Sequence, residues 1–167
     1  MAIRDMLLPE YDAEMANTRK LLERLPEKLT DYKPHPKSMP LGKLAPHVAQ
    51  LAGFGVPILN TPEVDFSAGS YKPLVVESPA QLVKVFDEGA AKVRAALIST
   101  PDEAWTETWK LLIGGKTIFD GTRFLGYRQM FLNHIVHHRA QLGVYLRLSG
   151  QPVPSVYGPS ADETLGF

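Results

Sequence analysis

Two histidines near the end of the chain have the spacing with which a helix binds a metal ion. His134 and His138 lie four residues apart, so on a helix their side chains share one face, with Cβ atoms about 6 Å apart. This spacing lets one helix offer two imidazoles to the same metal. The chain contains no Cys, so any metal must be held by imidazole, carboxylate or water ligands. The pair therefore predicts a site for one divalent transition metal.

The same spacing also has explanations that need no metal. The chain contains five histidines, and a pair four residues apart arises readily by chance. A buried His whose ring is hydrogen-bonded to a hydroxyl or a carbonyl is a common alternative. The zinc-protease motif H-E-x-x-H is excluded, because Ile135 stands where that motif has its catalytic Glu. The chain has the paired ligands of a peptidase helix but not its base.

The helix that would carry this pair is expected from about Thr122 to Leu148. Ser149-Gly150 then ends the periodic pattern. At about 100° per residue, the apolar positions of this helix form one narrow stripe. The stripe consists of Phe124, Tyr127, Phe131, His134, His138, Leu142 and Tyr145. Two histidines thus stand where a buried helix face usually has Leu or Ile.

A third histidine on another segment strengthens the prediction. His47 lies at the border of the apolar stripe of an expected second helix. Three inward His would form the open ligand set of a catalytic zinc-type site, with the remaining positions left for water or substrate. Pro46 should bend the helix just before His47. We favour a bend that aims His47 at the metal over one that spoils its ligand angle. We interpret His137 as a residue that supports the site or lies at the surface, and His35 as a loop residue.

Three further segments show the pattern of amphipathic helices. They run from about Pro9 to Leu25, with Pro9 in the first turn, from Ser38 to Asn60, and from Ser78 to Ser99. Gly114-Gly115 lies between two apolar runs and predicts a small hairpin before the last helix. Residues 61–76 show no clear element.

Amphipathic helices can hide their apolar stripes only by packing on one another. We therefore expect an all-α fold, a four-helix bundle that forms a single domain over residues 1–167. The long connections at residues 61–76 and 100–121 act as crossovers and exclude a simple up-down order with short loops.

Composition and charge exclude several partners. Eighteen basic and eighteen acidic residues cancel, and no basic cluster alternates with aromatic residues, so a nucleic-acid partner is disfavoured. No run is apolar enough to span a bilayer. The absence of a signal-like segment and of Cys favours a cytoplasmic location.

Three sequence blocks are typical of one known family. They are Leu41-Gly42-Lys43-Leu44-Ala45-Pro46-His47, then His134-Ile135-Val136-His137-His138-Arg139-Ala140-Gln141-Leu142, and Tyr157-Gly158-Pro159-Ser160-Ala161-Asp162-Glu163. Through them the chain resembles the DinB superfamily of DinB/YfiT-like proteins over nearly its whole length. The resemblance implies a four-helix bundle with an unusual helix order, commonly a homodimer. It also implies a metal, often nickel or zinc, bound by His47, His134 and His138.

The resemblance also suggests a function. Better-understood members of the family are thiol-dependent transferases that use bacillithiol, mycothiol or glutathione. We therefore expect a metal-dependent S-transferase that activates a low-molecular-weight thiol and acts on a small electrophile. The expected pocket is lined by Tyr11, Met15, Tyr127, Phe131 and Tyr145. The alternatives are a hydrolase that uses a metal-bound water, although no carboxylate lies on the inward stripes, and a non-catalytic dimer stabilised by its metal.

Overall fold

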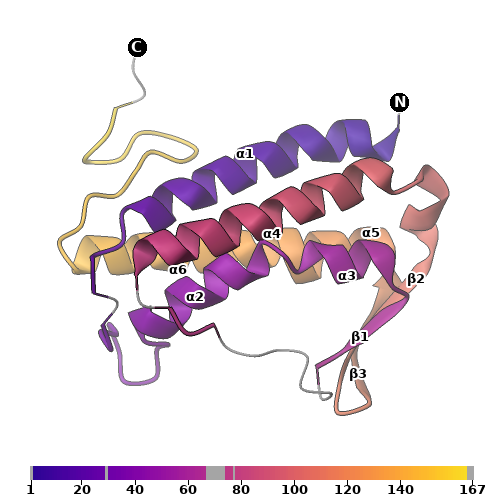
Figure 1. The fold of residues 1–167 in the computed structure, drawn as a ribbon, viewed down its shortest axis with the longest axis horizontal. Coiled ribbons are helices and arrows are strands. Elements are labelled where there is room, and N and C mark those ends of the chain that lie inside the picture. Colours follow the sequence, from indigo (N-terminus) through magenta and orange to yellow (C-terminus); the bar gives the residue numbers. More distant parts are fainter. Residues whose placement is uncertain (1, 29, 67–73, 77, 165–167) are drawn as a thin grey trace.

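Long helices that lie side by side make up most of the structure (Figure 1). The computed structural model describes residues 2–28, 30–66, 74–76 and 78–164. The helices are α1 (Ile3–Glu23), α2 (Leu41–Leu51), α3 (Gly55–Asn60), α4 (Pro79–Ser99), η2 (Asp102–Thr106), α5 (Arg123–Leu125), η3 (Gly126–Leu132) and α6 (Asn133–Leu148). α1 packs against α4 and α6, and α2 packs against the same two helices. No helix in the described residues is long and apolar enough to cross a membrane.

A three-stranded sheet at one end of the helices corrects the expectation of an all-α fold (Figure 1). β2 (Thr108–Ile113) and β3 (Lys116–Thr122) form the expected hairpin, in which Gly114 and Gly115 have φ values of 63° and 73°. Such positive φ values suit Gly in a two-residue turn. β1 (Glu63–Asp65) pairs in parallel with β2, within the connection where no element was expected. A strand this short cannot show the alternation by which strands are recognised.

α1 begins at Ile3 rather than at Pro9, so Pro9 lies inside the helix and not in its first turn. Two carboxylates support the earlier start. Asp5 accepts a hydrogen bond from the N–H of Ala2 at 3.1 Å, and Asp102 accepts one from the N–H of Ile3 at 3.0 Å. N–H groups at a helix start have no partner within the helix. Asp102 is far away in the sequence, so periodicity alone does not show this cap.

The expected second helix from Ser38 to Asn60 is divided in the structure. α2 has Pro40 at its N-cap, and a turn at residues 52–54 separates it from α3. α4 passes close to this turn, because a Cβ atom added to Gly89 would lie 2.8 Å from the backbone N of Gly53. Only a residue without a side chain fits at that distance. The close crossing therefore fixes where the helix ends.

α4 and the last helix lie where the sequence predicts them. Ser78 caps α4, since its Oγ accepts a hydrogen bond from the N–H of Gln81 at 3.4 Å. The last helix continues through α5, η3 and α6, and η3 is π-helical. A π-helical segment has more residues per turn than an α-helix. Phe124, which precedes it, is consequently rotated out of the predicted stripe and is 37% exposed.

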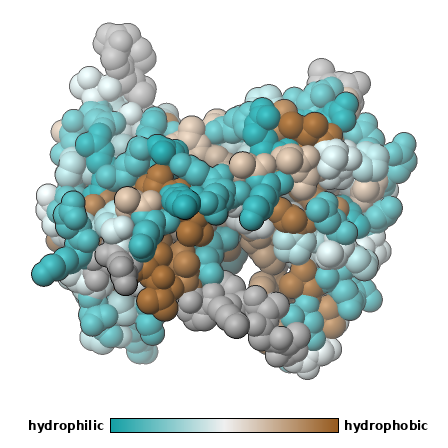
Figure 2. Space-filling view, viewed as in Figure 1, coloured by the Kyte–Doolittle hydropathy of each residue, from teal (hydrophilic) through white to brown (hydrophobic). Residues whose placement is uncertain are grey.

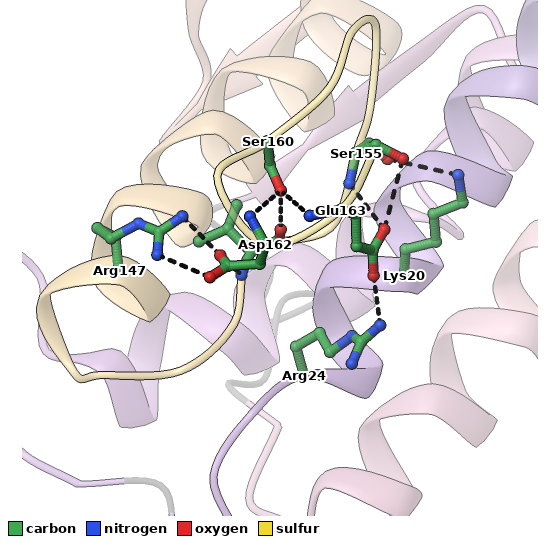
Figure 3. Close-up of polar contacts among 8 residues, drawn as sticks. Lys20, Arg24, Arg147, Ser155, Ser160, Asp162 and Glu163 are labelled. Carbon is green, nitrogen blue, oxygen red and sulfur yellow. Dashed lines mark hydrogen bonds and ion pairs between the residues drawn. The ribbon is translucent and has the colours of Figure 1, made fainter. Parts of the chain in front are cut away.

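The chain after α6 folds back against α1 and α6 through charged side chains (Figure 3). Asp162 accepts hydrogen bonds from both terminal nitrogens of Arg147, at 3.2 and 2.6 Å. Glu163 pairs with Arg24 at 2.5 Å and accepts a hydrogen bond from the N–H of Ser155 at 3.0 Å. The bond from Arg147 lowers the pKa of Asp162, and the bond from Ser155 lowers the pKa of Glu163. Polar contacts thus order a segment that shows no periodicity.

Candidate metal centre

Three histidines from two helices converge on one point. α2 contributes His47, and α6 contributes His134 and His138. One ligand nitrogen from each ring lies within 4.8 Å of the other two. The Nε2 atoms of His134 and His138 are 2.9 Å apart, and the ring centroid of His47 lies 4.6 Å from that of His138. All three side chains are half-buried. The structure therefore brings together the three histidines that the sequence singles out.

Hydrogen bonds orient the two rings of α6. Nδ1 of His134 lies 3.3 Å from the carbonyl oxygen of Met130, and Nδ1 of His138 lies 2.8 Å from Oε1 of Gln141. An acceptor oxygen at Nδ1 selects the ring form that has its proton there, so we assign an unprotonated Nε2 to both rings. A metal-binding His usually has such a partner at its other nitrogen. Both Nε2 lone pairs are thus available to a shared cation.

The surroundings keep the histidines neutral. Burial, reinforced by the neighbouring His138 and His134, lowers the pKa of His47 to about 4. Burial also lowers the pKa of His134 and of His138, although the hydrogen bonds from Nδ1 of His134 to the carbonyl of Met130 and from Nδ1 of His138 to Oε1 of Gln141 oppose the effect. Only a neutral imidazole can bind a metal, because protonation occupies its lone pair. The cluster is therefore ready to bind a metal at neutral pH.

Pro46 does not break α2. The helix continues past Pro46 to Leu51, and His47 reaches the two histidines of α6. The segment before α2 is attached to α6, because the hydroxyl of Tyr145 donates a hydrogen bond to the carbonyl of Met39 at 2.7 Å. His47 thus reaches the site from a helix that contains Pro46, and the expectation that a bend at Pro46 aims it there stays a prediction.

Among the described residues, the candidate metal cluster contains histidines only. Glu14, a buried carboxylate of α1, is paired with Arg139 at 2.5 Å. His137 is exposed and lies outside the cluster, although its ring centroid is 4.8 Å from that of His138. His35 is an exposed turn residue whose Nδ1 accepts a hydrogen bond from the N–H of Lys37. The site consequently has imidazole ligands and no carboxylate base within the cluster.

The five residues expected to line the substrate pocket lie in the core. They are Tyr11, Met15, Tyr127, Phe131 and Tyr145, each at most 6% exposed. The hydroxyl of Tyr11 donates to the carbonyl of Ala90 at 2.8 Å, and the hydroxyl of Tyr145 is engaged with Met39. Burial raises the pKa of Tyr11 and of Tyr127 well above their usual range. Their position on the apolar stripes correctly indicated that these side chains are buried. They pack in the core, however, and do not line the open pocket.

A different set of residues surrounds an open pocket of about 850 Å³ beside the histidines. His47 and His134 form part of its wall. Most of the remaining wall is apolar and comes from α2, α3, α4, β1, β2 and η3, with Phe54, Val56, Val64, Phe66, Val85, Leu111 and Met130 among the lining residues. No sequence pattern indicated this pocket, because its walls come from elements far apart in the chain.

The sequence is similar to those of known proteins. Residues 10–142 match the sequence model of the DinB superfamily. The uncharacterized protein YrdA of Bacillus subtilis (strain 168) is 26% identical over 170 residues, which cover 98% of this chain and 93% of that protein.

Solved structures share the fold. A DinB-like protein from Bacillus cereus ATCC 10987 superposes with a TM-score of 0.65 at 21% identity, over 90% of this chain and 95% of its own. The mycothiol-dependent maleylpyruvate isomerase superposes with a TM-score of 0.59 at 15% identity, over 84% of this chain and 60% of its own. At such identities the likeness concerns the fold alone.

Proposed function

This chain belongs to the DinB superfamily, and we propose that it is a metal-dependent thiol S-transferase that acts on a small electrophile. His47, His134 and His138 would hold one divalent transition metal, nickel or zinc. The observation that carries the proposal is the convergence of three neutral imidazoles on the wall of an open pocket.

The donor set fits such a metal. Imidazole nitrogen suits zinc and nickel, and three protein ligands leave at least one position for water or substrate. A structural zinc site is instead closed by four protein ligands. The cluster contains histidines only among the described residues and adjoins a pocket, so we favour a catalytic site over a metal that only stabilises a dimer.

A thiol substrate would supply the sulfur nucleophile that this chain does not contain. The protein has no Cys, so a sulfur nucleophile must come from a second molecule such as bacillithiol, mycothiol or glutathione. A bound divalent metal would lower the pKa of that thiol and favour its thiolate. The thiol would give up its proton to water, its sulfur would form a bond with the electrophilic carbon, and the leaving group would depart with the bonding pair. A structural neighbour that is a mycothiol-dependent isomerase supports this reading.

The alternative hydrolase has less support. A hydrolase that uses a metal-bound water is commonly assisted by a nearby general base, and Glu fills this role in the H-E-x-x-H zinc proteases. The cluster itself offers no carboxylate among the described residues, and Glu14 is paired with Arg139.

We further propose, from family membership, the four-helix bundle of this family, a homodimer and a cytoplasmic location. Light scattering of the purified protein would test the dimer.

Metal analysis and a thiol panel test the proposal. Purified protein should contain about one metal per chain, and His138→Ala should lose it, because two imidazoles hold a divalent metal far more weakly than three. His137→Ala is the matched control, since His137 is the exposed neighbour outside the cluster. Full metal occupancy in His138→Ala would exclude the site. Turnover of a model electrophile should require one of the thiols, and turnover without any thiol would favour the hydrolase.

A further inference from the structure

The pocket beside the histidines has the chemistry of a binding site for an apolar molecule. Its walls combine aromatic and branched aliphatic side chains, and the rings of Phe54 and Phe66 lie 5.5 Å apart at an interplanar angle of 31°. Figure 2 shows a hollow near the middle of this face with apolar side chains on either side. At about 850 Å³ the pocket is within the range of sites that enclose drug-sized ligands.

We propose that this pocket binds the electrophilic substrate, and that this substrate is a neutral, predominantly apolar small molecule. The proposal rests on the proposed function in so far as the bound molecule is the acceptor of the thiol. Its reacting carbon would face His47 and His134, which are the lining residues that belong to the candidate metal centre.

The charges around the pocket favour a neutral ligand. Glu88 and Lys92 of α4 are its charged lining residues among those described. They have opposite charges and are both exposed, so water screens them and together they contribute no net charge. Most of the remaining wall is apolar, and transfer of a charged group from water to an apolar wall costs free energy.

The shape of the pocket follows from the break between α2 and α3. The turn at residues 52–54 packs against α4 where Gly53 meets Gly89, and the chain then continues into α3, so that Phe54 and Val56 both line the pocket. These two side chains are half-buried, so a ligand that covers them would remove apolar surface from water. Met130 lines the same wall, and a flexible Met adapts to ligands of different outline.

Two dyes that differ by one sulfonate test the proposal without any turnover. N-phenyl-1-naphthylamine is neutral and apolar, and 8-anilinonaphthalene-1-sulfonate adds a negative charge to the same rings. Measured by the fluorescence of the directly excited dye, the neutral one should bind to the wild-type protein about tenfold more tightly, because the mostly apolar wall solvates the sulfonate poorly. Equal binding, or tighter binding of the anionic dye, would overturn the assignment of a neutral ligand.

Substitutions at two valines of α4 locate the bound dye. Val85 lines the pocket, whereas Val83 is an equally half-buried valine of the same helix that packs on the core outside it. Val85→Trp fills the pocket and should weaken binding of the neutral dye about tenfold, whereas Val83→Trp should leave it unchanged. Val85→Lys adds a charge at the same position and should also weaken binding. Unchanged binding in both Val85 variants would refute the site.

Paramagnetic metal tests the orientation toward the histidines. Loading with Co²⁺ should quench the bound neutral dye, whereas Zn²⁺ should not, and His138→Ala should abolish the effect. A dye that binds but shows no quenching in cobalt-loaded protein would contradict the placement beside the metal. These measurements contain no thiol, so a failure of thiol transfer in the assay above leaves them unaffected, and the two proposals fail separately.

Discussion

Replacing Arg139 by Met should destabilise the protein more than any exposed substitution, because it leaves a buried carboxylate without its partner. Arg139 is 3% exposed and Glu14 is 8% exposed. The guanidinium donates to Oε2 of Glu14 at 2.5 Å and to the carbonyl of Glu14 at 3.2 Å. The hydroxyl of Tyr157 donates to the same carboxylate at 2.7 and 2.8 Å. One buried ion pair thus joins α1, α6 and the C-terminal segment.

The magnitude follows from the burial of the pair. Removal of one partner of a buried ion pair costs about 3–5 kcal/mol. For a chain of this length each kcal/mol lowers the melting temperature by about 2–4 °C, so Arg139→Met should lower it by about 6–20 °C. Tyr157→Phe should cost only about 1 kcal/mol, because the Tyr157 side chain is 70% exposed and water can replace its hydroxyl.

Urea denaturation of the single variants and of the Glu14→Met/Arg139→Met double variant would measure these costs. The double variant removes both charges and replaces them with apolar side chains of similar length. It should therefore be more stable than Arg139→Met alone. A double variant whose loss equals the sum of the two single losses would refute the reasoning, because it would show that the two side chains contribute independently.

Other predictions concern pH, a buried cation and the C-terminal segment. Folding lowers the pKa of His47 from 6.5 to about 4, so the unfolded chain binds the extra proton in this window and the stability of the metal-free protein should fall as the pH is lowered through it, as thermal melts would show. Arg123→Met should cost about 2–4 kcal/mol in urea denaturation, because buried carbonyls lose their donor; the guanidinium bonds the carbonyls of Ile58, Leu59 and Thr61 at 2.6, 3.2 and 2.9 Å. The pKa of Asp162 is lowered mainly by Arg147, so the segment's attachment is complete above the usual Asp pKa and should be lost as the pH falls through the lowered value, as increased proteolysis after α6 would show.

Local signals in the sequence predicted the elements that local interactions determine. Ser78 marked the start of α4, and Gly114-Gly115 marked the hairpin. Long-range contacts decided the rest. β1 was missed because its evidence lies across the sheet, where the Asp65 carboxylate accepts hydrogen bonds from the N–H groups of Gly114 and Gly115 at 3.1 and 3.0 Å. The turn after α2 lies against Gly89, which belongs to another helix.

In the candidate site, too, the sequence predicts one part and not the other. The spacing of His134 and His138 already places them on one face of a helix, and His47 joined them through the resemblance to a known family. The pocket was different, because the apolar stripe of a helix indicates what is buried and not what remains open. Tyr127 illustrates this: it lies on the predicted stripe and is fully buried, whereas Phe54, from the turn after α2, lines the pocket.

The contact between His134 and His138 supports the proposed metal over the simpler explanations of a buried histidine pair. With Nδ1 of each ring facing an oxygen, the two Nε2 lone pairs point at each other across 2.9 Å, and they repel unless a positive charge lies between them. A shared proton would supply that charge, but it requires one ring to be an imidazolium, and burial lowers the pKa of both rings. His47 adds a third imidazole, and its pKa is lowered to about 4. A shared proton bridges only two nitrogen atoms, so it would leave the third lone pair unused. A divalent cation can use all three lone pairs, and this supports the proposed metal.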